Sequence, residues 1–169
     1  KYIQEATSFE PGKEAVSKHH WVIYRYAETL LTYAESMVNA FNDVNYTDET
    51  YKYSALWAIN EVRKNADMPL IPSMGKDEFM ERLYNEWRVE FAFEDHRFWD
   101  IRRWLIADDE GVMKGAMYGL QLSAVTGAPG KVHYKPYVFE NRLWSDRSYL
   151  HPIKQTEIDK GYMLQNPGW

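Results

Sequence analysis

Residues 86–104 read EWRVEFAFEDHRFWDIRRW, a stretch that mixes charged and aromatic residues at helical spacing. Glu86, Glu90 and Glu94 lie four residues apart, so they share one face of a helix. Carboxylates at this spacing repel one another unless cations lie between them, and guanidinium groups suit partly buried carboxylates best. The stretch therefore predicts a structural ion-pair ladder whose members are Glu86, Arg88, Glu90, Glu94, Arg97, Asp100 and Arg103.

A corner is expected inside this stretch, near Asp95. The apolar spacing predicts one helix from about Lys76 to Glu94 and a second helical piece over residues 96–106. Asp tolerates left-handed backbone better than most residues, so it can stand where one helix turns into the next. We expect the ladder to hold this corner.

Two more helices are predicted upstream of the ladder. The first carries an apolar stripe at alternating spacings of four and three, formed by Ile23, Ala27, Leu30, Ala34, Met37 and Phe41. Thr47 is the expected N-cap of the second helix, which runs through Ala55 to Val62 and is closed by Pro69. The short polar connection and the alanines on both faces predict a close-packed αα-hairpin.

The rest of the chain has weaker patterns. Residues 1–20 are polar and are expected to form a lead-in loop. Glycines and prolines punctuate residues 108–148, which predicts mostly loop with short strands at 132–134 and 137–139. The tail predicts an extended stretch and then a short helix capped at Thr156. The expected fold is mainly α, with tetratricopeptide-like αα-hairpins, long irregular loops and a few short strands.

Composition narrows the function classes. The 169 residues carry a net charge of -5 with dispersed Lys and Arg, whereas nucleic-acid binders usually show a basic face. The absence of cysteine excludes thiolate catalysis and Cys-based metal sites within the sequence, and the five histidines lack ligand spacing, so no metal or cofactor is predicted. The aromatic content of 16% fits both a packed core and the stacking of sugar rings on exposed aromatic faces.

Three ordered blocks resemble the SusD/RagB family. Residues 86–104 are similar to its signature E-R-R-x-E-[FL]-x-x-E-G-x-R-[FYW]-x-D-[LI]-x-R-W, with Trp87 in place of an Arg and Asp95 in place of the corner Gly. Residues 25–35 resemble its R-x-A-E-x-x-L-x-Y-A-E-A helix, and residues 60–63 add a shorter match to its L-N-x-[VI]-R. The tail resembles P-I-P-x-x-E-I and Q-N-P-G-Y, with Lys154 replacing a Pro and Trp169 a Tyr.

The resemblance implies a non-catalytic protein of the Bacteroidetes cell surface. Members are outer-membrane lipoproteins that capture oligosaccharides, or peptides in some cases, and deliver them to a SusC-like TonB-dependent transporter. Residues 1–169 would be the C-terminal segment of a single mainly α domain whose N-terminal part, with its lipid anchor, is absent. A start at Lys1 with no leader or initiator Met fits that expectation.

No position matches a binding motif of the family. The region 108–148 is the expected source of ligand contacts, because aromatic platforms beside an Arg suit sugars; its candidates are Tyr118, Tyr134, Tyr137, Arg142 and Trp144. These aromatics could instead pack the loop onto the helices. The acidic run 108–110 lacks the spacing of a calcium loop and reads as a solvated helix end.

Other function classes stay open. An α-helical scaffold would explain the helical hairpin but none of the three blocks. An all-α glycoside hydrolase could use Glu86 and Glu90 as acid and base, since side chains four residues apart on a helix lie close to the separation in retaining enzymes. Neighbouring arginines would hold both carboxyl pKa values low, whereas a general acid needs a raised pKa.

Overall fold

The computed structural model describes residues 11–12, 22–125, 127 and 130–169. The predicted lead-in at residues 1–20 therefore lies outside the described residues, apart from a turn at Pro11 and Gly12. The chain divides into two compact units, Lys1–Glu94 and Asp95–Trp169, called here the helical unit and the C-terminal unit. Among the described residues there are five α-helices and one two-stranded antiparallel sheet, so the mainly α expectation is met in part.

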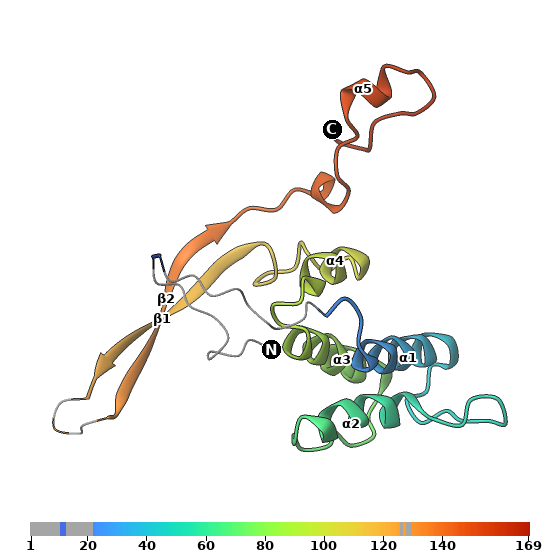
Figure 1. Cartoon of the computed structure of the whole chain (residues 1–169), viewed down its shortest axis with the longest axis vertical. Coiled ribbons are helices and arrows are strands. Elements are labelled where there is room, and N and C mark those ends of the chain that lie inside the picture. The colour runs from blue at the N-terminus through green and yellow to red at the C-terminus, as the bar shows by residue number, and fades with distance from the viewer. Residues whose placement is uncertain (1–10, 13–21, 126, 128–129) are drawn as a thin grey trace. The chain divides into compact units, whose positions relative to one another are not determined.

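The helical unit consists of α1 (Tyr26–Phe41), α2 (Ala55–Asn65) and α3 (Lys76–Glu90), and α1 packs against both of the others (Figure 1). Its core is formed by one face of each helix, and the largest fully buried side chains are Phe79, Leu31, Ile59, Leu83 and Val38. Ala34, Ala55 and Ala58 are fully buried, as expected where two helix backbones approach closely. The tetratricopeptide-like arrangement stays a prediction.

Two helix starts differ from the sequence prediction. α1 begins at Tyr26, and Ile23 is 86% exposed, so the apolar stripe starts one turn later than its spacing indicates. α2 begins at Ala55, where the Ser54 hydroxyl accepts the backbone N–H of Trp57. Thr47 is therefore not its cap. The carboxylate of Asp48 instead accepts the N–H groups of residues 50 and 51, which stabilises a turn.

The predicted corner is present at Asp95. Its φ of 63° and ψ of 5° are left-handed, and α4 (His96–Arg103) begins at the next residue. α3 ends at Glu90, earlier than Glu94, because residues 91–95 form successive turns. Phe93, in these turns, also has a left-handed φ and is 83% exposed.

The C-terminal unit contains a long β-hairpin where mostly loop was predicted. β1 (Gly115–Ala124) pairs antiparallel with β2 (Val132–Arg142), with a bulge between Met117 and Tyr118. The short strands predicted at 132–134 and 137–139 both lie within β2, and Pro136 between them is tolerated because a two-stranded sheet has only edge strands. A 3₁₀ turn, η2 (Asp146–Tyr149), and α5 (Gln155–Ile158) follow. α5 has no side-chain cap, so Thr156 does not cap it.

No helix in the described part of the chain is both long and apolar enough to cross a bilayer.

The left-handed backbone at Asp95 predicts a stabilising substitution. Asp95→Gly should raise the free energy of unfolding by up to about 1 kcal/mol, because an L side chain is disfavoured at this φ and the greater entropy of unfolded glycine offsets part of the gain. Asp77→Gly, in the first turn of α3, should lower it. Denaturant titration measures both; a loss of stability in Asp95→Gly would contradict the strain argument.

Candidate functional site

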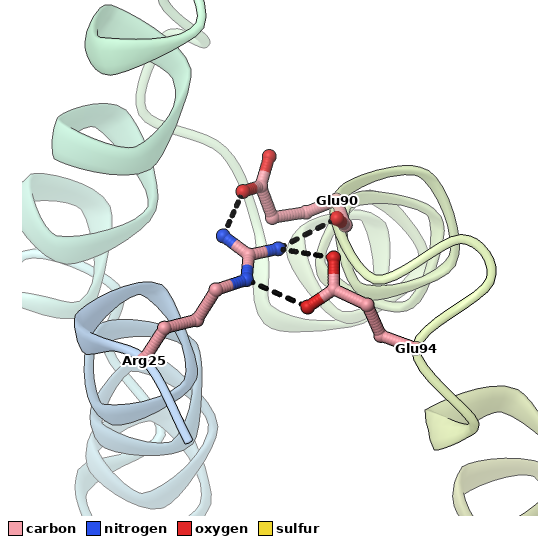
Figure 2. A network of polar contacts seen from close by, with 3 residues as sticks. All are labelled: Arg25, Glu90 and Glu94. Atoms are coloured by element: carbon pink, nitrogen blue, oxygen red, sulfur yellow. Dashed lines mark hydrogen bonds and ion pairs between the residues drawn. The ribbon is translucent and has the colours of Figure 1, made fainter. Parts of the chain in front are cut away.

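The carboxylates of the 86–104 stretch bind arginines that come from other segments. Arg25, directly before α1, reaches both Glu90 and Glu94 of the same unit (Figure 2). Its Nε donates to Glu94 at 2.8 Å and one Nη donates to the Glu90 carbonyl at 2.7 Å, while the other Nη binds the Glu90 carboxylate. The guanidinium also lies 4.2 Å from the centre of the Phe91 ring. Burial opposes its charge, but the hydrogen bonds to Glu94 and Glu90 outweigh burial and raise the pKa of Arg25.

A second arginine fixes the connection between α2 and α3. Arg63 Nη1 lies 2.5 Å from the carboxylate of Glu86, which is only 6% exposed, and Arg63 Nε donates to the Pro69 carbonyl. One turn earlier, the Asn60 amide bonds both the N–H and the C=O of Ile71, at 2.9 and 3.0 Å. Residues 60–63 thus hold the α2–α3 loop at two points.

The remaining members of the ladder lie apart from these pairs. Arg103 bonds Asp100 within α4 at 3.3 Å, and Arg97 is half-buried in the same helix. Arg88 is exposed and forms no ion pair with any residue in the described ranges. Glu86 and Glu90 each bond a guanidinium, so both carboxylates have structural partners.

The end of the chain is held by a similar arrangement. The Gln165 amide bonds the N–H and the C=O of Ile153, at 2.8 and 2.9 Å. The indole N–H of Trp169 donates to the carbonyls of Arg147 and Leu150. Gly168 has a φ of +84°, and a Cβ there would lie 2.9 Å from the Arg147 side chain, so the turn requires glycine.

This clamped tail borders an open hollow of about 640 Å³, called here the terminal hollow. It is lined by residues 145–147, 149–150 and 167–168, all in the C-terminal unit. Arg147 is one of the lining residues, and its guanidinium lies 4.5 Å from the centre of the Trp169 ring. Asp146 is exposed, and its carboxylate has no hydrogen-bond partner in the part of the chain that the structure describes. A carboxylate, a guanidinium and aromatic rings together suit a polyhydroxylated ligand.

An aromatic cluster lies between α4 and the segment after β2. The Arg102 guanidinium lies 3.7 Å from the Phe98 ring and 5.4 Å from the Trp144 ring. The Phe98 ring also contacts Trp99, which is 61% exposed, and His151. Burial lowers the pKa of Arg102. The cluster positions the segment that forms one wall of the terminal hollow.

Comparison with known proteins identifies the family. The family model described as the SusD family matches residues 1–169. The chain belongs to the SusD family.

Solved structures of SusD relatives agree with the fold. A SusD-like protein from Bacteroides fragilis NCTC 9343 matches with a TM-score of 0.70 and 29% identity over 88% of this chain. A SusD superfamily protein from Parabacteroides distasonis ATCC 8503 matches with a TM-score of 0.56 and 21% identity, also over 88%. The match covers 26% and 27% of those chains, about a quarter of their length. No curated protein matched the chain.

In this SusD-family chain, the predicted ligand contacts do not form one platform. Tyr118 and Tyr134 lie on one face of the hairpin and Tyr137 on the other, because their cross-strand partners alternate along the register. Arg142 binds Glu140 at 2.9 Å. Trp144 is half-buried, and its indole N–H is buried with no hydrogen-bond acceptor among the described residues.

Sequence reasoning missed the residues of the terminal hollow. Asp146 and Arg147 are followed by Tyr149, whose ring meets that of Trp144 edge-on at 5.0 Å between centres. The one signal in the sequence is the terminal Q-N-P-G-W block, which supports the family resemblance without indicating a hollow. Its amide and indole groups bend the tail back onto residues 147–153.

Loss of the Glu86 charge should destabilise the helical unit. Glu86→Gln leaves Arg63 without its counter-ion in a mostly buried position, which should cost about 3 kcal/mol of unfolding free energy. Glu78→Gln is the matched control on the same helix, because its pair with Arg82 is exposed and 3.9 Å apart; its cost should stay below about 0.5 kcal/mol. Urea titration separates the two. An equal loss of unfolding free energy in the two variants would show that the bond between Arg63 and Glu86 contributes no more than an exposed ion pair.

The hydrogen bond between Tyr149 and Asp108 predicts a pH response. Accepting this bond lowers the pKa of Asp108, whereas burial, followed by the bond itself, raises the pKa of Tyr149. The contribution of Asp108 to folding stability is therefore present above its unfolded pKa of about 3.9, and it is lost as pH falls through its folded pKa. The contribution of Tyr149 to folding stability is present below its unfolded pKa of about 10, and it is lost as pH rises through its folded pKa.

Carboxyl NMR titration tests this bond directly. In Tyr149→Phe the pKa of Asp108 should rise toward its ordinary value. In the control Tyr162→Phe, which removes a similar bond to Glu157, the pKa of Asp108 should stay where it is. An unchanged Asp108 pKa in Tyr149→Phe would contradict the assigned cause.

Proposed function

We propose that this chain is part of a non-catalytic surface protein that captures oligosaccharides and delivers them to a SusC-like TonB-dependent transporter in the outer membrane. Family membership supports this role. The chain spans about a quarter of its solved relatives, so ligand contacts can also come from residues outside it. The protein would sit on the extracellular face, held by an N-terminal lipid anchor outside these residues.

The terminal hollow is the proposed contribution of this segment to ligand binding. Its volume of about 640 Å³ lies within the usual range for small-molecule sites, roughly 300–1,000 Å³. The observation that carries the proposal is that Asp146, which is exposed, and Arg147 both line the hollow, while the Arg147 guanidinium lies 4.5 Å from the centre of the Trp169 ring. A carboxylate can accept hydrogen bonds from neighbouring hydroxyls and a guanidinium can donate to others. An aromatic face such as that of Tyr149, which lines the hollow, can stack on the C–H face of a sugar.

The hairpin tyrosines remain a separate prediction. Tyr118 and Tyr134 are 68% and 61% exposed. They lie on the same face of the hairpin, with the pair Leu120–Pro136 between them. A peptide ligand is the alternative substrate class, because the same charged pair would bind peptide groups. Glu86 and Glu90 each form an ion pair with an arginine, which favours a binding role over hydrolysis.

Calorimetry on the full-length protein tests the proposal. A panel of plant, fungal and host oligosaccharides, with peptides alongside, should contain at least one ligand. Asp146→Ala should weaken its binding by about tenfold or more, the loss expected for a hydrogen bond to a charged group. Asp109→Ala, an exposed acid outside the hollow, should leave binding unchanged.

Three results would contradict parts of the proposal. Silence across all glycans and peptides in a folded protein contradicts the binding role. Unchanged affinity in Asp146→Ala places the ligand outside the terminal hollow. Release of reducing sugars from a bound oligosaccharide by the pure protein contradicts the non-catalytic role.

A further inference from the structure

The β-hairpin has one apolar and one polar face. Side chains of directly paired residues lie on the same face of an antiparallel sheet, and successive residues alternate between faces. One face therefore carries four pairs of apolar or aromatic residues, called here the apolar face: Tyr118–Val138, Leu120–Pro136, Leu122–Tyr134 and Ala124–Val132. The opposite face carries Gly119–Tyr137, Gln121–Lys135 and Ser123–His133.

The apolar face is exposed along its whole length. Tyr118, Leu120 and Leu122 of β1 are between 61% and 68% exposed, and their neighbours on β2 are also exposed. No described residue of the C-terminal unit covers it. Isolated apolar side chains are normal on a surface, but a continuous apolar row of this kind marks a surface that contacts something else.

The pattern is typical of a sheet with one buried side. Antiparallel sheets with one face on a core and one in solvent show this clean alternation. A two-stranded hairpin is marginally stable alone and gains independent stability by packing its apolar face on another element. The ten-residue β1 and eleven-residue β2 are long for a ribbon that packs on nothing.

We propose that the apolar face packs against a part of the full-length protein that lies outside residues 1–169. Solved SusD-like chains are about four times as long as the matched segment, so most of the surface that could cover the hairpin comes from outside it. A permanent intramolecular contact also fits the composition of the face, which offers Leu, Val and Pro and no charge. This places Tyr118 and Tyr134 in an interior contact, in competition with a role in sugar stacking.

Single-cysteine labelling in the full-length protein tests the contact. The 169 residues contain no cysteine, so Leu122→Cys and Ser123→Cys place adjacent thiols on opposite faces. Alkylation at each site is followed by mass spectrometry of the peptide that contains it. If the apolar face is covered, residue 122 should react at least about tenfold more slowly than residue 123, since the thiol is reached only through local opening. Leu120→Cys and Gln121→Cys form a second matched pair.

The conditions under which residue 122 is protected from alkylation show what covers the apolar face. Protection in a monomer without ligand or partner supports the proposal. Equal rates on the two faces overturn it. Protection that disappears on dilution identifies a second copy, protection that requires the transporter identifies that partner, and protection that requires an oligosaccharide restores the sugar-stacking role; each of these overturns the proposal. None of these outcomes depends on whether the terminal hollow binds glycan.

Discussion

The helical unit depends on guanidinium groups that reach the carboxylates of α3, and of the turn after it, from distant segments. Arg25 lies 65 and 69 residues from Glu90 and Glu94, and Arg63 lies 23 residues from Glu86. Three carboxylates on successive turns would repel one another, and Glu86 is too buried for water to solvate its charge. The arginines satisfy these charges only when α1, α2 and α3 are in place, so the charged network favours one packing of the three helices.

Amide side chains fix the irregular segments in both units. Asn60 holds the loop before α3 by bonding the backbone of Ile71, and Gln165 holds the tail by bonding the backbone of Ile153. Each amide donates and accepts as a neighbouring strand would, which satisfies backbone groups that have no ladder partner. In the C-terminal unit this bonding brings residues 167–168 against residues 145–150 and so forms the terminal hollow. The family blocks that identify the chain are thus largely the groups that hold its loops and helices.

Local features were predictable from the sequence, and long-range ones were not. The apolar stripe of α1 and the left-handed corner at Asp95 follow from spacing and from the conformational preference of one residue. The hairpin was predicted only in part, as two short strands within β2, because Pro136 and several glycines are typical of loops, although edge strands accept them. The sequence indicated the carboxylates of the ladder, but it did not indicate that Arg25 and Arg63 bond them, because tertiary packing decides which arginines come close. The terminal hollow depends on the backbone path of the tail, which composition does not encode.

A double-mutant cycle between Arg25 and Glu90 tests most directly whether the arginine bonds hold the helices together. The unfolding free energies of the full-length protein, Arg25→Ala, Glu90→Ala and the double variant give the coupling energy, and oligosaccharide affinity is measured on the same four proteins. A structural bond predicts a coupling above about 1 kcal/mol with unchanged affinity. Additive effects within about 0.3 kcal/mol, or a loss of affinity in folded single variants, would contradict it.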